Sequence, residues 1–125
     1  MMIRPLYSLI GPRLRYVNRL DAKGRPVDKP KVLTKKELQA IMPRLSGWTL
    51  ANNRLSRTFE FHDFVASLSF INSLVAYFET ADHHPDVAIA YGEVTFTLTR
   101  YDVGGKVTDR DVEVAKKISS TYRRN

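Results

Sequence analysis

A long apolar run at helical spacing, followed at once by residues that alternate, most constrains what this chain can fold into. Its apolar residues recur every three or four positions, at Phe64, Leu68, Ile71, Val75 and Phe78. This spacing predicts the buried stripe of a helix of about five turns. Asp63 is a suitable N-cap, and Phe70, Leu74 and Tyr77 widen the apolar face. A face this wide is expected to serve both the core and a subunit contact.

Alternating residues on either side of this helix predict two β-hairpins. Over residues 87–91 Val, Ile and Tyr alternate with Ala, and over residues 94–99 apolar residues alternate with Thr, with a turn expected at Gly92-Glu93. Upstream, a short strand at residues 48–50 and an alternating run at 55–61 predict the other hairpin, with Trp48 as a packing residue.

Two capping-box patterns predict the remaining helices. Thr34 with Glu37 begins a helix expected over residues 35–42, and Thr108 with Asp111 begins one expected over residues 108–122. The inward-facing residues of the second are expected to be Val112, Ala115, Ile118 and Tyr122. Together these elements predict an α+β fold, a four-stranded and largely antiparallel sheet with helices packed on one face.

The positive charge is concentrated at the N-terminus. The formal charge is +7 for the chain, of which residues 1–31 carry +6. We therefore predict a basic leader and linker over residues 1–32 and a nearly neutral domain over residues 33–125, which argues against direct nucleic-acid binding by the domain. The first twenty residues contain four arginines and no acidic residue, a composition typical of mitochondrial transit peptides; a plain basic arm is the alternative.

Other classes are disfavoured by what the sequence lacks. There is no cysteine, so no disulfide framework and no thiolate nucleophile is available. No apolar run approaches the roughly 20 residues of a membrane span, so none is predicted.

Titratable side chains gather at one corner, Asp82-His83-His84-Pro85-Asp86, between the long helix and the next strand. Adjacent histidines at a helix end point in different directions, and no nearby third ligand completes a metal site, so none is predicted. Imidazoles exchange protons near neutral pH, and Glu79 is placed to assist them, which favours general acid–base chemistry. The alternative is an ordinary helix end, where histidine complements the helix dipole and Pro85 stops the helix.

Four segments together resemble the pterin-4a-carbinolamine dehydratase family. They are residues 79–86 (ETADHHPD), 91–99 (YGEVTFTLT), 102–105 (DVGG) and 108–111 (TDRD), and the likeness runs from about Leu33 to the C-terminus. The resemblance implies a four-stranded antiparallel sheet with helices on one face, and homodimers or homotetramers in which the long helices pack between subunits. It also implies dehydration of a small-molecule pterin, 4a-hydroxytetrahydrobiopterin, to the quinonoid dihydropterin, without a metal or cofactor.

The resemblance also assigns site residues. His83 and His84 match the family's histidine pair and Glu79 its acid, which implies acid–base catalysis by these residues. The substrate-binding residues it implies are Tyr101, Asp82, Asp102, Asp111 and Thr99. The family's third histidine is replaced by Tyr101, a phenol that is expected to position substrate by hydrogen bonding because its ordinary pKa near ~10 makes it a poor proton carrier. The alternative function is that of a catalytically weak or inactive dehydratase-like protein that acts as a dimerisation or assembly factor for a protein partner.

Overall fold

The computed structural model describes residues 30–124, which form one four-stranded antiparallel sheet and its helices. The predicted leader, and with it the mitochondrial transit peptide, lies outside the described residues apart from its end. The elements in chain order are α3 (Lys35–Ile41), η1 (Met42–Arg44), β1 (Thr49–Ala51), β2 (Arg54–Glu60), α4 (Phe64–Ala81), β3 (Asp86–Ala90), β4 (Glu93–Leu98), η2 (Tyr101–Val103) and α5 (Asp109–Arg123).

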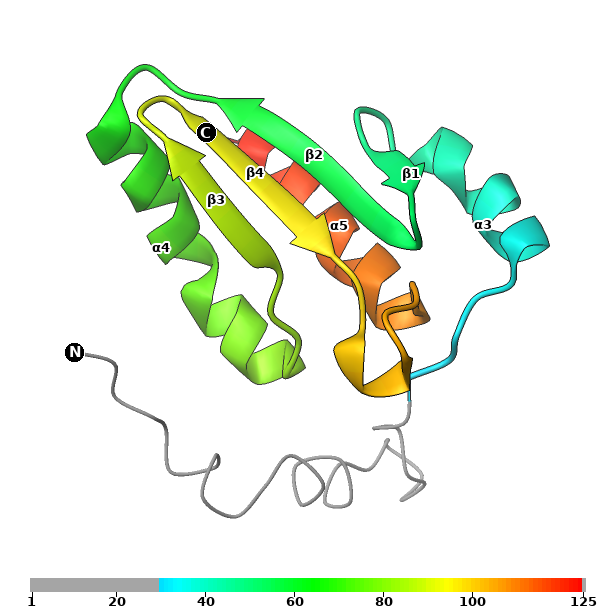
Figure 1. Ribbon diagram of the computed structural model, residues 1–125. Helices are drawn as coiled ribbons and strands as arrows, with labels where there is room; N and C mark the ends of the chain where they lie inside the picture. Colours follow the sequence, from blue (N-terminus) through cyan, green and yellow to red (C-terminus); the bar gives the residue numbers. More distant parts are fainter. Residues whose placement is uncertain (1–29, 125) are drawn as a thin grey trace, which may run out of the picture. The chain divides into compact units, whose positions relative to one another are not determined.

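The sheet has the order β1-β2-β4-β3, and every neighbouring pair is antiparallel. Figure 1 shows α4 and α5 covering one face of the sheet, with α3 beside β1 at its edge. The α+β architecture with helices on one face, expected from the sequence, is confirmed.

Helix starts follow the predicted caps. Thr34 and Glu37 form a capping box at α3, and Thr108 and Asp111 form another at α5. At α4, the side chain of Asp63 accepts a hydrogen bond from the backbone N–H of Ala66 at 2.8 Å. These local contacts satisfy backbone donors that have no partner within the helix, so they fix where each helix begins.

The core lies between the sheet and the two long helices, and aromatic rings dominate it. Phe59 of β2 packs against the rings of Phe70, Phe96 and Tyr122 at centroid distances of 4.8–5.9 Å. Trp48 is 5 % exposed and meets Phe59 edge to face, which confirms its prediction as a packing residue. The prediction of the inward-facing residues of α5 is also confirmed, since Val112, Ala115 and Ile118 are buried and Tyr122 packs against the core.

The predicted buried stripe of α4 is confirmed only in part: Phe78 is buried and Ile71 packs against the core, whereas the other three residues are exposed. The residues of α4 that the core buries are Ser67, Phe70, Leu74 and Phe78. Phe64, Leu68 and Val75 are instead 39–46 % exposed. Because apolar residues occur almost all round this helix, their spacing does not select one face. The contacts of Phe70 with Phe59, Phe61 and Phe96 select it instead.

By length and composition alone, α4 is the one helix within residues 30–124 able to cross a membrane, with a mean hydropathy of 1.3 over 18 residues. Core helices pass the same test, and one face of α4 packs in the core. The composition of α4 is therefore weak evidence of a membrane span.

The segment just before α3 is tied to the start of α5. The backbone N–H of Asp109 donates to the carbonyl of Lys31, the Asp109 side chain accepts from the Lys31 N–H at 3.0 Å, and Val32 forms a bridge with Thr108. These contacts hold the start of α5, the helix that carries Asp111, against the segment before α3.

Two leucines of α4 test which face is buried. We expect Leu74→Ala to lower the free energy of unfolding by about 2–5 kcal/mol, because it leaves a cavity at a site that is 1 % exposed. The same truncation at Leu68, 39 % exposed, is expected to cost about 1 kcal/mol or less. Urea denaturation of both variants, at a protein concentration low enough for the chain to be monomeric, measures the difference, and equal losses would contradict the assignment of the core face.

Candidate functional site

The site is built on the turn between α4 and β3. Asp82 caps α4 in the left-handed conformation (φ 53°, ψ 42°), which short polar side chains tolerate. Its N–H donates to the carbonyl of Glu79 and the N–H of His83 donates to the carbonyl of Phe78, each at 3.2 Å. This helix end sends His83 inward and His84 outward, so the predicted divergence of the two rings is confirmed.

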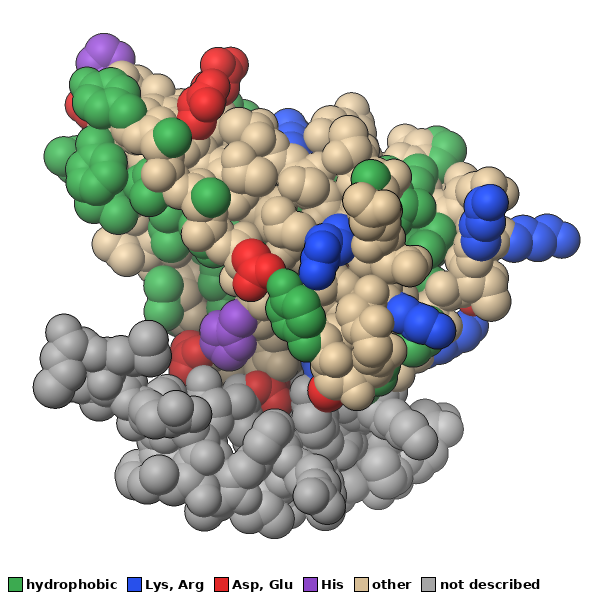
Figure 2. Space-filling view, in the orientation of Figure 1, with side chains coloured by type: hydrophobic (Ala, Val, Ile, Leu, Met, Phe, Trp, Pro, Cys, Tyr) green, Lys and Arg blue, Asp and Glu red, His purple; other side chains and the backbone are tan. Residues whose placement is uncertain are grey.

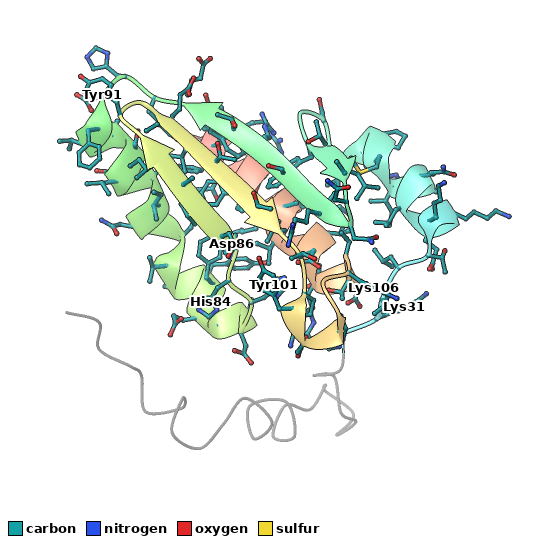
Figure 3. The ribbon with its side chains drawn as sticks, viewed as in Figure 1. Lys31, His84, Asp86, Tyr91, Tyr101 and Lys106 are labelled. Carbon is teal, nitrogen blue, oxygen red and sulfur yellow. The ribbon has the colours of Figure 1, made fainter. Side chains whose placement is uncertain are left out.

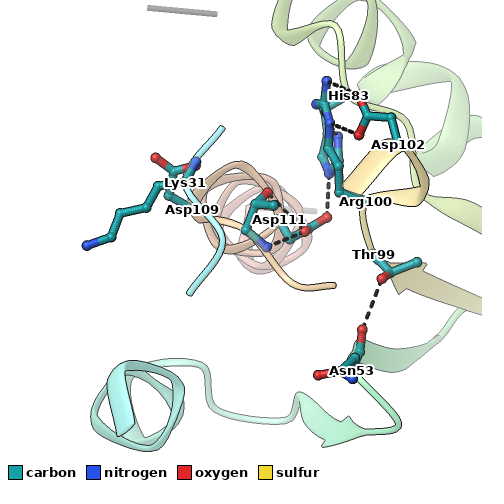
Figure 4. Close-up of polar contacts among 9 residues, drawn as sticks. Lys31, Asn53, His83, Thr99, Arg100, Asp102, Asp109 and Asp111 are labelled. Carbon is teal, nitrogen blue, oxygen red and sulfur yellow. Dashed lines mark hydrogen bonds and ion pairs between the residues drawn. The ribbon is translucent and has the colours of Figure 1, made fainter. Parts of the chain in front are cut away.

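His83 is buried, and both of its ring nitrogens are engaged. Only 5 % of the residue is exposed, Nε2 meets the carboxylate of Asp111, and Nη1 of Arg100 lies 3.3 Å from Nδ1. An arginine is only a donor, so Nδ1 of His83 accepts and the ring proton sits on Nε2, where it is donated to Asp111. Figure 4 shows this chain of contacts.

Asp111 is held by the cap of α5. Its Oδ2 accepts from the Thr108 N–H at 2.7 Å and from the Thr108 hydroxyl at 3.1 Å, and its Oδ1 meets His83. The residue is fully buried. Asp111, predicted to bind substrate, thus has both carboxylate oxygens occupied within the protein.

Arg100 and Asp102 complete the buried chain. The Arg100 guanidinium donates through Nε and Nη2 to the two carboxylate oxygens of Asp102, at 2.9 and 3.3 Å. Arg100 is 4 % exposed, whereas the Asp102 side chain is 53 % exposed. The chain Asp102–Arg100–His83–Asp111 therefore runs from the surface to the start of α5.

His84 has the opposite surroundings. Its side chain is 43 % exposed, and Nε2 pairs with the carboxylate of Glu79, itself 48 % exposed. Among the described residues, Nδ1 of His84 has no hydrogen-bond partner. This nitrogen is available to a ligand on the surface, with an acidic partner behind it.

Tyr101 forms a second exposed pair with Asp86. Its hydroxyl donates to Oδ2 of Asp86 at 2.5 Å, and the guanidinium of Arg54 lies 6.0 Å from the ring centroid. The hydrogen bond to Asp86 raises the pKa of the Tyr101 phenol above its ordinary value of 10.0, and desolvation adds to this. Tyr101 is therefore a proton-bearing donor at neutral pH. His84, Asp86 and Tyr101 all lie at the same end of the sheet (Figure 3).

Thr99 has a structural partner. It is 5 % exposed, and its hydroxyl donates to the carbonyl of Asn53 in the β1–β2 turn at 3.0 Å. This bond fixes the turn that carries Arg54. Thr99, predicted to bind substrate, is thus engaged with the protein backbone.

Sequence reasoning assigned no role to Arg100 or Arg54, and it did not predict the hydrogen bond between Asp86 and Tyr101. Asp86 lies 15 residues from Tyr101 in the chain, and Arg100 lies 17 residues from His83. No local spacing in the sequence therefore signals either contact. The described residues contain no group of three or more His, Asp or Glu placed to hold a metal ion.

The site is an open surface. Two hollows of the domain lie elsewhere, one against the C-terminal half of α5 and one between the start of α4 and the end of α5. In Figure 2, a histidine lies beside acidic side chains at two places in the view, and the lower of the two is at the corner where Figure 3 labels His84.

Comparison with known proteins identifies relatives over this whole domain. The model of the family described as "Pterin 4 alpha carbinolamine dehydratase" matches residues 31–121. Two relatives named "Putative pterin-4-alpha-carbinolamine dehydratase" are similar over 88 residues, covering 70 % of this chain and 94 % of the relative. The protein from Sulfurisphaera tokodaii is 44 % identical and that from Nostoc punctiforme is 46 % identical. The crystal structure of a "transcriptional coactivator/pterin dehydratase" from Brucella melitensis superposes with a TM-score of 0.69 at 31 % identity, covering 74 % of this chain and 99 % of that one.

Proposed function

The chain belongs to the pterin-4a-carbinolamine dehydratase family, and on this premise we propose that it dehydrates a 4a-hydroxytetrahydropterin at the His84 corner. In this reaction the C4a–O bond breaks, the departing hydroxyl takes a proton and leaves as water, and N5 gives up its proton as the C4a=N5 double bond forms. The reaction needs one proton donor and one proton acceptor near adjacent atoms. General acid–base catalysis by a positioned side chain suits this need.

His84 is the proposed proton carrier. It is exposed, its Nδ1 has no partner among the described residues, and its Nε2 pairs with the carboxylate of Glu79. Because the hydroxyl and N5 are both bonded to C4a, one imidazolium can give its proton to the leaving hydroxyl and then take the N5 proton. The ring ends in its starting state, and the protons balance.

His83 has a different proposed role. Its ring nitrogens are engaged by Arg100 and Asp111, so it acts as a positioning residue that anchors the turn carrying His84. This revises the expectation that both histidines carry protons. The observation behind the proposal is this difference between the two rings.

Tyr101 is the proposed hydrogen-bond partner of the pterin: its one hydroxyl hydrogen, donated to Asp86 in this structure, would be redirected to a pterin acceptor on binding. Its phenol keeps its proton at neutral pH, since its ordinary pKa of 10.0 is raised further by the hydrogen bond to Asp86, so it orients substrate without exchanging protons. Asp102 and Asp82 flank the same corner, and we retain them as proposed substrate contacts, while the contacts of Asp111 and Thr99 favour structural roles for these two.

An assay of two histidine variants tests the proposal. We expect His84→Ala to reduce the enzymatic dehydration rate, above the spontaneous rate, by about 10²- to 10⁴-fold. The matched control is His62→Ala, which truncates an exposed histidine at the other end of α4 and should leave the rate unchanged. A wild-type rate equal to that of buffer, or equal rates in the two variants, would contradict the proposal.

A second function, association with another protein chain, is favoured by the exposed face of α4. Phe64, Val65, Leu68 and Val75 are 39–69 % exposed on this helix, and Figure 2 shows apolar side chains along this edge of the molecule. The Brucella melitensis neighbour is described as a coactivator as well as a dehydratase. We propose that a second copy of this chain covers the face, giving a homodimer or homotetramer, and that a partner protein binding there is the alternative.

Val75→Asp tests this association, because a charge in an apolar interface costs free energy that a charge in water does not. We expect the variant to sediment as a smaller species than the wild type. Ser73→Asp places the same charge at an exposed position about 160° round the helix from Val75, and should keep the wild-type size. A wild-type monomer at micromolar concentration would overturn self-association.

A further inference from the structure

A hollow of ≈ 410 Å³ lies between the segment after η1 and the C-terminal half of α5. Its lining includes the basic residues Arg44, Lys116, Lys117 and Arg123, together with Ser119 and Ser120, and no carboxylate. Ser119 lies eight residues beyond Asp111 on α5, or about 12 Å along the helix axis. The hollow is therefore separate from the His84 corner.

Three of the basic side chains are available to a ligand. Lys117 packs over the ring of Tyr77 at 5.4 Å. Within the part of the chain that the structure describes, Arg44, Lys116 and Arg123 form no ion pair with a carboxylate. A helix end attracts cations such as Arg123 without any ligand, but this effect does not account for Arg44, which comes from another element.

Arg57 adds a half-buried positive charge beside the hollow. Its Nη1 donates to the carbonyl of Ser46 at 3.0 Å and to the hydroxyl of Ser119 at 3.1 Å, and its guanidinium lies 4.3 Å from the ring centroid of Phe59. These partners are all neutral. Since charges removed from water are normally paired, this guanidinium strengthens the attraction for an anion in the adjacent hollow.

Ser119 supplies a hydrogen-bond donor inside the hollow. It is 9 % exposed, and its Oγ accepts from Nε1 of Trp48 at 2.8 Å as well as from Arg57. Both lone pairs are therefore used. The hydroxyl hydrogen has no acceptor among the described residues and remains for an acceptor placed in the hollow.

We propose that this hollow binds the phosphate group of a small phosphorylated molecule. Arg44, Lys116 and Arg123 supply the charge, the Ser119 hydroxyl donates to a phosphate oxygen, and the arginines suit bidentate contact with phosphate. The volume falls within the range of small-molecule sites and leaves room beyond a single phosphate. The inference does not depend on the dehydratase proposal.

Trp48 provides the readout. It is the single tryptophan of the chain, and its indole N–H donates to Ser119, so a ligand at Ser119 changes its surroundings. We expect the full chain, titrated with inorganic phosphate and with pyrophosphate at constant ionic strength, to show a saturable fluorescence change. Pyrophosphate should bind more tightly, and calorimetric titration should give the same Kd.

Two double variants separate a site from general charge. Arg44→Ala/Lys116→Ala should weaken pyrophosphate binding at least tenfold, because it removes two of the three proposed cations. Lys35→Ala/Lys36→Ala removes the same charge from exposed positions on α3 and should keep the wild-type Kd. Equal weakening in both, or no saturable binding by either readout in a folded wild type, would overturn the proposal.

Discussion

The buried contact between His83 and Asp111 organises the site, because it joins the end of α4 to the start of α5. Asp111 caps α5 through Thr108 and meets His83 with its other oxygen. Arg100, at the end of β4, closes the chain from the opposite side of the imidazole. Removing one partner would leave a buried charge or polar group unsatisfied, which costs more than a surface contact of the same kind. The turn that presents His84 is therefore held from three elements.

This arrangement explains how two adjacent histidines acquire different chemistry. His83 is enclosed and has both nitrogens engaged, while His84 is exposed beside Glu79 with one nitrogen open. A residue with no open nitrogen exchanges protons with a substrate only after its own contacts break. The fixed position of the His83 ring thus holds the neighbouring His84 in place, as a preorganised site requires. Tyr101, which donates its hydroxyl hydrogen to Asp86, adds a phenol that keeps its proton at neutral pH.

The sequence predicted the features that depend on short-range contacts. Both capping boxes, the Asp63 cap and the hairpin alternation were correct because each involves residues within a few positions of one another. The divergence of the two histidines followed from the helix end for the same reason. The buried face of α4 was predicted only in part, because the choice among its apolar residues is made by rings of β2 and β4. Arg100 was overlooked because its contact with His83 spans 17 positions, and a buried arginine has no signature in composition.

The protonation state of His83 tests the account most directly. Long-range ¹H–¹⁵N correlation spectra of the labelled protein at pH 7 distinguish the two neutral tautomers of an imidazole from its cation. The account predicts that His83 carries its proton on Nε2 alone, with Nδ1 accepting from Arg100, and that Arg100→Ala changes this signal while His62→Ala does not. A doubly protonated His83 in the wild-type protein would contradict the division of roles between the two histidines.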